Sequence, residues 1–390
     1  MKKRRRVLDA KRCTIAGTLV VSIALAIACG LNPVATDDAR EPPAADPPAV
    51  PPRFSANHPC GVYALDSRTG RYREANIRSY PFVSGYVLRP SWPELEPAKD
   101  RYDFTMVDQV VQRLQAIGKK LSLEVIRPPE PSYIVETPGV ATWFDTWKEI
   151  DTRRPVPWDP YTLARFEAFV RALAEHRIPD ATKGGALTRL REHAVLANVN
   201  FGIPGAHAAI RDPVEFRIMD MPGYTREKFK DAVLRYLRAI TDNFPEQAPY
   251  VGFWTVQDRA QPALWEEIRT AILSEFDGVR RPRMGFFQEN LAASRDPATG
   301  AVFGTPQTSF AATLYQSRNQ TPILFQALQG WNTPFMTEAK TANATPSDGI
   351  QFAYETYYAR YVELYVSDLD DPRYWPSFEQ WHARLCRTAE

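Results

Sequence analysis

Carboxyl side chains follow two apolar segments in the second half of the chain. Asp258 follows the segment 253–256 and Glu289 follows the segment 285–287. Two carboxyl groups can hydrolyse a glycosidic bond when they flank it, about 5–5.5 Å apart for retention or about 6.5–9.5 Å apart for inversion. If both segments are neighbouring strands, their side chains reach one cleft, and Glu289 beside Phe287 is desolvated enough to hold a proton. We therefore predict Asp258 and Glu289 as the catalytic pair.

Each carboxylate also has a purely structural interpretation. Asp258 can cap the helix that follows it, and Glu289 can pair with Arg127 or Arg259. Glu363 lies inside an apolar segment, where it can contact a substrate or be the partner of an interior ion pair. The two interpretations differ in whether these groups face a common cleft.

Aromatic and amide side chains near the ends of the apolar segments suggest a sugar-binding surface. Flat rings cover the C–H faces of a pyranose, and amides form hydrogen bonds with its hydroxyl groups. Any one of the nine tryptophans can equally pack between helices and a sheet. The predicted substrate-binding residues are Arg127, Asn200, Trp254, Gln326, Trp331 and Glu363. We expect the partner to be a carbohydrate.

Charge and motif patterns argue against other classes of ligand. The first 12 residues carry seven basic and one acidic side chain of a chain whose net charge is +2, so the remainder carries −4 and has no basic excess for nucleic acid. The five histidines form no HExxH pattern, and no CxxC pattern is present, so we expect no metal. No Gly-rich phosphate turn follows any predicted strand, so we expect no nucleotide cofactor.

The elements that must position these residues alternate along the chain. Short β-branched or aromatic segments are separated by segments with helical spacing, and one of these places Val107, Val111 and Leu114 on one face. The predicted strands are 61–64, 82–88, 120–126, 195–201, 250–256, 283–287, 322–326 and 361–366. Eight strands alternating with helices predict an α/β fold, a single (β/α)8 TIM barrel. A doubly wound open sheet is the alternative.

Residues 85–126 read GYVLRPSWPELEPAKDRYDFTMVDQVVQRLQAIGKKLSLEVI. This segment resembles the β-galactosidase-like glycoside hydrolases, TIM barrels of the large retaining clan. The resemblance rests on Arg89, Trp92, the segments 94–97 and 102–104, and Gly118 before a strand. It implies an acid/base Glu at the end of strand four and a nucleophile Glu at the end of strand seven.

The sequence departs from that pattern at both positions. Strand four, at 198–207, and strand seven, at 325–332, contain no carboxylate. Two hypotheses follow. The first is a glycoside hydrolase that acts on an oligosaccharide or envelope glycan with carboxylates from other strands. The second is a catalytically inactive barrel that binds carbohydrate or supports an envelope assembly.

The N-terminal segment has the pattern of an export signal. A basic start is followed by an uncharged apolar segment, 14–28, which is shorter than the roughly 20 residues that span a bilayer. We predict a signal peptide at 1–28, lipidation of Cys29 in a sequence that resembles a bacterial lipobox, and a Pro/Ala-rich linker at 29–55. The barrel domain would then span 56–390, anchored to a membrane of the cell envelope through its lipid.

Two further cysteines lie at the extremities of the folded region. Cys60 precedes the first predicted strand, and Cys386 lies near the end of the chain. An exported protein can oxidise such a pair, and a closed barrel brings its first strand next to its last helix. We predict a disulfide between them, with two buried free thiols as the alternative.

Overall fold

The computed structural model describes residues 58–66, 77–126, 129–145, 152–202, 218–247, 250–252, 262–276, 284–304, 310–331, 333 and 344–387. The chain divides into two units, Met1–Pro47 and Pro48–Glu390. All the described residues belong to the second unit. The predicted signal peptide, Cys29 and the whole predicted linker, 29–55, lie outside the described residues and stay predictions.

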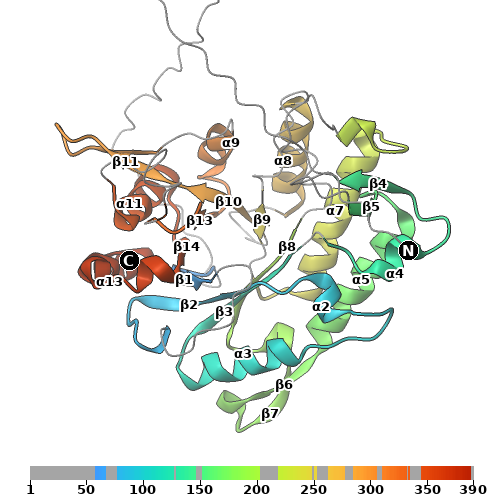
Figure 1. Cartoon of the computed structure of the whole chain (residues 1–390), viewed down its shortest axis with the longest axis horizontal. Coiled ribbons are helices and arrows are strands. Elements are labelled where there is room, and N and C mark those ends of the chain that lie inside the picture. The colour runs from blue at the N-terminus through green and yellow to red at the C-terminus, as the bar shows by residue number, and fades with distance from the viewer. Residues whose placement is uncertain are drawn as a thin grey trace, which may run out of the picture. The chain divides into compact units, whose positions relative to one another are not determined.

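Eight parallel strands close into a barrel, which confirms the predicted fold (Figure 1). The strands follow one another around the barrel in chain order, and the last pairs with the first. Each of them falls within or overlaps one of the eight predicted segments. They are β1 (Gly61–Leu65), β2 (Val83–Leu88), β3 (Lys120–Val125), β8 (Leu196–Phe201), β9 (Tyr250–Gly252), β10 (Gly285–Leu291), β13 (Ile323–Ala327) and β14 (Tyr361–Tyr365).

Alternate residues of these strands fill the interior of the barrel, because successive side chains of a strand point to opposite faces. A separate buried cluster of large side chains packs there. Its members are Tyr63, Leu65, Val87, Phe287, Leu324 and Tyr361. Towards the carboxyl ends of the strands the interior positions become polar, and this change defines the candidate site.

Helices surround the strands and bury their apolar faces against them (Figure 1). They are α3 (Thr105–Ala116), α5 (Pro160–Glu175), α7 (Arg226–Asn243), α8 (Pro262–Phe276), α9 (Phe310–Ser317), α11 (Pro346–Tyr357) and α13 (Trp375–Leu385). The predicted face of α3 is correct, since Val107, Val111 and Leu114 have no exposed surface. Helix α5 begins where Asp159 accepts a hydrogen bond from the backbone N–H of Thr162 at 2.8 Å.

Shorter elements decorate the loops of the barrel. Three antiparallel hairpins form from β4 with β5, β6 with β7, and β11 with β12. The short elements are α2 (Trp92–Leu95), α4 (Ser132–Glu136), β4 (Thr142–Asp145), β5 (Thr152–Pro155), β6 (Arg177–Asp180), η2 (Ala181–Lys183), β7 (Ala186–Arg189), η3 (Leu190–Glu192), η4 (Ile218–Asp220), β11 (Ala293–Arg295), β12 (Val302–Gly304), α12 (Val366–Leu369) and η6 (Pro372–Tyr374).

A disulfide joins Cys60 to Cys386, with 5.1 Å between their Cα atoms, and confirms the predicted pair. Cys60 directly precedes β1, and Cys386 directly follows α13. Arg360 strengthens the same junction, since its Nε donates to the carbonyl of Leu385 at 2.8 Å and its own carbonyl accepts from the N–H of Gly61 at 2.7 Å. The closed barrel brings these two ends of the domain together, as the pairing requires.

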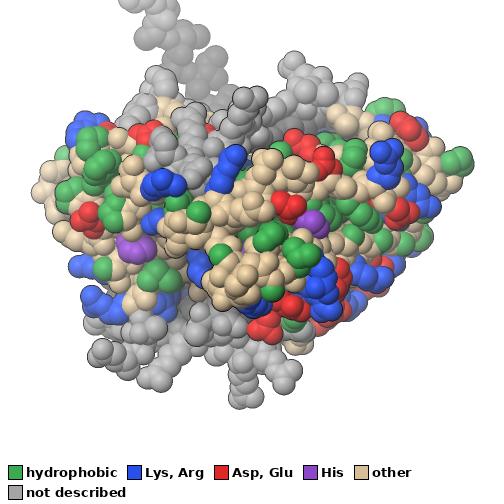
Figure 2. Space-filling view, turned by 90° about the horizontal axis from the view of Figure 1, so that it is seen from below, with side chains coloured by type: hydrophobic (Ala, Val, Ile, Leu, Met, Phe, Trp, Pro, Cys, Tyr) green, Lys and Arg blue, Asp and Glu red, His purple; other side chains and the backbone are tan. Residues whose placement is uncertain are grey.

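Charged and apolar side chains are mixed over the surface. Figure 2 shows one face of the molecule, on which acidic and basic side chains lie interspersed among the described residues. Among the described residues, the exposed large apolar side chains are Met106, Phe144 and Leu187, which belong to three different elements. Within the described ranges, no helix has both the length and the apolarity needed to cross a membrane.

A buried ion-pair network secures the loop between β2 and α3. Glu96 has no exposed surface, and its carboxylate accepts hydrogen bonds from the indole N–H of Trp92 at 2.8 Å and from the backbone N–H of Asp100 at 3.1 Å. The guanidinium of Arg165, from α5, pairs with Glu96 and Asp100 and donates to the hydroxyl of Tyr133 at 3.1 Å. The network ties a long loop to the helix layer.

Changing Glu96 to glutamine is expected to lower the free energy of unfolding by about 1–3 kcal/mol. The amide keeps the size of the side chain, but its NH2 group faces N–H donors and Arg165 loses a buried charge partner. Urea denaturation measures the change. Glu136→Gln is the matched control, because Glu136 is an exposed carboxylate. Equal stabilities of the two variants would contradict the role of the network.

Candidate active site

Polar side chains line the interior at the carboxyl ends of four strands. Glu124 of β3 is in register with Asn200 of β8, and Gln326 of β13 is in register with Glu363 of β14. Residues in register on parallel strands face the same side of the sheet, so each pair lies side by side within the barrel. All four are buried. Polar groups at this depth need partners, which makes this end of the barrel the candidate site.

Arg89, directly after β2, contacts two carboxylates that are far apart in the sequence, Glu124 and Glu289. Its Nε lies 2.9 Å from Oε2 of Glu124, and its Nη2 lies 3.5 Å from Oε1 of Glu289 on β10. Burial alone would lower the pKa of Arg89, but the negative charges of Glu124, Glu289 and Glu363 raise it above its usual range. The guanidinium therefore stays charged at the centre of three carboxylates.

The three carboxylates differ in their access to solvent. The side chain of Glu289 is 18% exposed, that of Glu124 is 9% exposed, and Glu363 has no exposed surface. Access matters because a group that exchanges a proton with a substrate must reach it. Glu289 is therefore the best placed of the three to meet a ligand at the mouth of the barrel.

Glu363 is held from within the barrel. The hydroxyl of Tyr361 donates to Oε1 of Glu363 at 2.6 Å and lies 2.9 Å from Oγ of Ser122, across the barrel on β3. Burial, and then the charge of Glu363, raise the pKa of Tyr63 well above its usual range. These buried groups fix the position of Glu363, whose charge acts on the site through Arg89.

Three buried amides border this network. Asn198 on β8 has no exposed surface, and neither its Oδ1 nor its Nδ2 has a hydrogen-bond partner among the described residues. Oδ1 of Asn200 and Oε1 of Gln326 also lack partners within the described part of the chain. Buried amides are normally satisfied by protein, by ordered water or by a ligand. Asn200 and Gln326 can thus accept hydrogen bonds from the hydroxyl groups of a sugar.

The structure brings four of the predicted site residues into this region of the barrel. They are Glu289, Glu363, Asn200 and Gln326, all on strands that form the carboxyl end of the interior. Arg127 and Arg259, the suggested partners of Glu289, lie outside the described residues. Glu289 forms an ion pair with Arg89. Their catalytic and binding roles stay predictions.

Trp331 occupies a different place. It is 2% exposed, and its ring lies against the backbone of Gly349 in α11, so closely that a Cβ at that glycine would come within 2.4 Å of the indole. Its backbone N–H donates to Oδ1 of Asp368 at 2.7 Å. Trp331 packs between the end of β13 and the helix layer, and contact with a substrate stays a prediction.

Arg127, Trp254 and Asp258 lie outside the described residues, so the predicted pair of Asp258 with Glu289 has no geometry here. In the described part of the chain, no three His, Cys, Asp or Glu side chains lie close enough to hold a metal ion. Glu124 and Glu289 both contact the guanidinium of Arg89.

Two site residues were not singled out from the sequence. Glu124 lies inside the segment 120–125, where Ser122 and Glu124 alternate with apolar residues. That alternation is a signal for polar side chains facing the interior. Arg89 was treated as part of an architectural motif, although an arginine that ends a strand reaches the same end of a barrel as the catalytic groups do.

The carboxylates lie one strand away from the positions that the resemblance implies. Strand four of the barrel, β8, carries Asn200, while its neighbour β3 carries Glu124 in register. Strand seven, β13, carries Gln326, while its neighbour β14 carries Glu363 in register. Strands four and seven thus carry interior amides, and the strand beside each carries an acidic group in register with the amide.

The arrangement contains what acid–base hydrolysis requires. Because Glu124 and Glu289 reach the same guanidinium at 2.9 and 3.5 Å, their bonded oxygens lie closer together than the upper limit of about 9.5 Å for paired glycosidase carboxyl groups. A buried, charged Arg89 can also stabilise negative charge that shifts between them. Two carboxyl groups and amide oxygens without partners among the described residues thus lie at one end of the barrel, where they can form hydrogen bonds with a sugar.

Comparisons with known proteins find the fold but no close relative. No protein-family model matches the chain, and no curated protein matches it. The β-galactosidase from the psychrophilic Marinomonas ef1 superimposes with a TM-score of 0.50 at 10% identity, covering 83% of this chain and 59% of that one. Xylanase 10B from Thermotoga maritima gives a TM-score of 0.46 at 9% identity, covering 83% and 95%.

This chain spans less than two thirds of the length of the β-galactosidases from Marinomonas ef1 and Rahnella sp. R3, at 59% and 57%. At about 10% identity, such a likeness shows the fold alone. The eight-stranded closure agrees with it. The chain therefore has the TIM-barrel fold found in glycoside hydrolases.

Proposed function

We propose that this protein is a glycoside hydrolase that acts on an oligosaccharide or a glycan of the cell envelope. One observation carries the proposal, namely that Arg89 holds Glu124 and Glu289 together at the carboxyl end of the barrel. Active sites of TIM-barrel enzymes lie at that end. Cleavage of a glycosidic bond is the reaction that two neighbouring carboxyl groups perform most directly. Among the described residues no group of His, Cys, Asp and Glu side chains could hold a metal ion.

Each group has a role in the proposed reaction. Glu289, the most exposed carboxyl group, protonates the leaving oxygen, and Glu124 acts as the nucleophile or as the base for water. The positive charge of Arg89 offsets the negative charges of Glu124 and Glu289. The negative charge of buried Glu363 also acts on Arg89 and so reduces this compensation. Asn200 and Gln326 bind sugar hydroxyl groups. Asp258 remains a predicted alternative partner for Glu289.

A carbohydrate-binding barrel without activity is the second candidate. It is favoured by the same ion pairs, because a carboxylate held by a guanidinium is less available for proton transfer. It is also favoured by the amides on strands four and seven. In that case the buried amides would hold the sugar, and Arg89 would only balance charge.

An activity panel separates the two candidates. The purified protein is incubated with aryl glycosides and polysaccharides, and released reducing sugar is measured for the wild type and for Glu289→Gln. The matched control is Glu192→Gln, since Glu192 is an exposed carboxylate in η3, before β8. Turnover that Glu289→Gln loses and Glu192→Gln keeps supports the enzyme. Glycan binding without turnover in the wild type supports the inactive barrel instead.

We further propose that the protein is exported and tethered to a membrane through a lipid on Cys29. The support is the basic start, the apolar segment 14–28 and the Pro/Ala-rich linker that follows. A disulfide between Cys60 and Cys386 is consistent with an oxidising compartment. The linker gives the barrel reach from the membrane to an envelope glycan.

Changing Cys29 to alanine is expected to move the protein from the membrane fraction to the soluble fraction, because no thiol remains for the lipid. Membrane and soluble fractions of expressing cells are compared by immunoblot, and metabolic labelling with a fatty acid reports lipidation. Cys13→Ala is the matched control, since Cys13 lies in the same N-terminal segment but away from the cleavage site. Membrane retention of Cys29→Ala would disprove the lipid anchor.

A further inference from the structure

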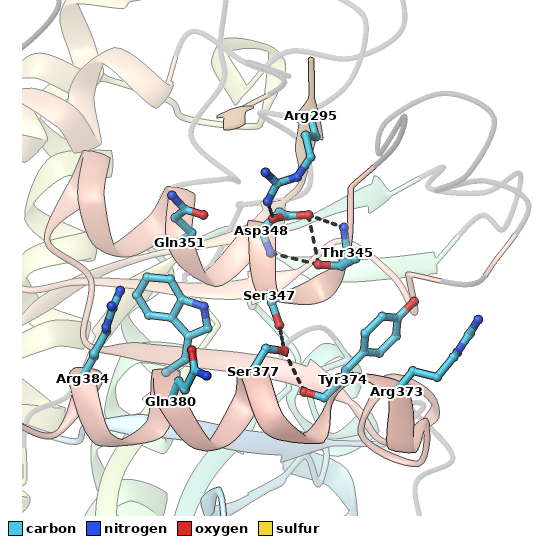
Figure 3. A pocket seen from close by; sticks show the side chains of 11 residues that line it. Arg295, Thr345, Ser347, Asp348, Gln351, Arg373, Tyr374, Ser377, Gln380 and Arg384 are labelled. Atoms are coloured by element: carbon cyan, nitrogen blue, oxygen red, sulfur yellow. Dashed lines mark hydrogen bonds and ion pairs between the residues drawn. The ribbon is translucent and has the colours of Figure 1, made fainter. Parts of the chain in front are cut away.

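A second candidate binding site lies on the outside of the barrel. A groove of about 520 Å³ runs between α11 and α13 and is shown in Figure 3. Its volume falls within the range of about 300–1,000 Å³ that is typical of ligand sites. Both helices belong to the outer layer, so the groove is separate from the cluster around Arg89.

Two of the three arginines that line the groove are already neutralised. Arg295, from β11, pairs with Asp348 at the start of α11. Arg373 binds the carboxylate of Asp371 through its Nε at 2.9 and 3.0 Å. These two ion pairs cancel the charges of Arg295 and Arg373, so the third arginine, Arg384, determines the charge of the groove.

Among the described residues that line the groove, Arg384 is the one arginine without an ion pair. It is exposed on α13 and forms no ion pair with any described residue. Its Cζ lies 5.0 Å from the centroid of the Trp381 ring, which holds the guanidinium over an aromatic face. A guanidinium that is positioned but unpaired is suited to a carboxylate, which it can bind through two parallel hydrogen bonds.

Uncharged polar side chains line the groove together with Arg384. Gln380 is exposed one turn before Arg384 on α13, so both side chains share a face of the helix, and its amide has no hydrogen bond within the described ranges. Ser347 and Ser377 reach the groove from facing helices and bond to each other. Because the hydroxyl of Ser377 donates to the carbonyl of Tyr374 at 2.7 Å, the serine oxygens are available to a ligand as acceptors. The groove therefore offers one positive charge beside amide and hydroxyl groups.

We propose that this groove binds a uronate unit of an acidic glycan. Its single carboxylate matches the single unpaired guanidinium of Arg384, and its hydroxyl groups match Gln380 and the serine pair. A phosphate group would bring more negative charge than one guanidinium balances. The glycan class rests on the proposed function, but binding here does not require catalysis at Glu289.

The groove also has a role for a polymeric ligand. Helix α11 begins after β13 and η6 follows β14, so one end of the groove lies towards the carboxyl ends of the strands, where the catalytic cluster lies. When the groove binds one part of a polymer, the rest of the same polymer has a high local concentration near the catalytic cluster at the mouth of the barrel. The groove would thus act as an anchoring site for long acidic chains.

Binding of trigalacturonate by the full chain tests the proposal. Calorimetric titration of the wild type is expected to show saturable binding, and Arg384→Gln is expected to weaken it at least tenfold. The fully methyl-esterified trisaccharide, which lacks the charge, is expected to lose binding to a similar extent. The matched control is Arg171→Gln, because Arg171 is an exposed arginine on α5; it is expected to bind as the wild type does.

Three outcomes would contradict the proposal that the groove binds a uronate. They are absence of binding by the wild type, equal affinity of Arg384→Gln and the wild type, and displacement of the trisaccharide by an equal concentration of inorganic phosphate. Glu289→Gln is titrated in parallel and is expected to retain binding. Loss of activity with retained binding would therefore distinguish the catalytic site from the groove, and failure of one would not be mistaken for failure of the other.

Discussion

Replacing Glu289 with glutamine is expected to lower kcat by at least about a hundredfold. The amide keeps the shape of the side chain but can neither donate an acidic proton to a leaving group nor carry the charge of a nucleophile. Initial rates with a glycoside that the wild type cleaves measure the loss. The barrel should remain folded, because Glu289 is partly exposed and its contact with Arg89 is long, at 3.5 Å.

The leaving group of the substrate separates two roles for Glu289. If Glu289 is the acid, an aryl glycoside with a very acidic phenol recovers much of the lost rate, since its departure needs little protonation. If Glu289 is the nucleophile, the loss persists with every leaving group. A fully active variant, or one whose melting temperature falls together with its activity, would show that Glu289 serves only as the ion-pair partner of Arg89.

Removing the disulfide is expected to lower the free energy of unfolding by about 2–5 kcal/mol. Cys60 and Cys386 are 326 residues apart in sequence, so their bond restricts a very long loop of the unfolded chain. Denaturation of the Cys60→Ser/Cys386→Ser double variant in guanidinium measures the change. The double serine replacement avoids leaving a reactive thiol in place.

Reductant provides the control for that measurement. The wild type treated with dithiothreitol should unfold at the denaturant concentration of the double variant, whereas the double variant itself should be insensitive to the reductant. If the wild type and the variant have the same midpoint under oxidising conditions, the bond contributes little to stability. The contacts of Arg360 with Leu385 and Gly61 would then suffice to hold the two ends together.

The barrel could be predicted because its determinants are local. Each strand is a short apolar segment, and each major helix has a face of apolar residues, such as Val107, Val111 and Leu114 in α3. The disulfide followed from the topology, since a closed barrel makes its first strand and last helix neighbours. The three hairpins were not predicted, because strands of three or four residues leave too short an alternation to recognise.

The site was predicted only in part, because its contacts are not local. Arg89 and Glu289 are 200 residues apart, and nothing near either residue shows that they meet. Glu289 could be proposed because it follows an apolar segment of the sequence, whereas no sequence motif marks Glu124 or the guanidinium that joins them. Trp331 is 2% exposed and packs against α11, an orientation that sequence alone does not show, and its contact with a substrate stays a prediction.

The junction at Cys60 and Cys386 makes the folded part of the chain a covalent ring. Their Cα atoms are 5.1 Å apart, a distance that a few residues of peptide could also bridge. A single proteolytic cut in any loop of this ring leaves both halves attached to each other. The same closeness makes the domain suitable for circular permutation, in which a short peptide replaces the disulfide and new ends open in a loop on the opposite side of the barrel.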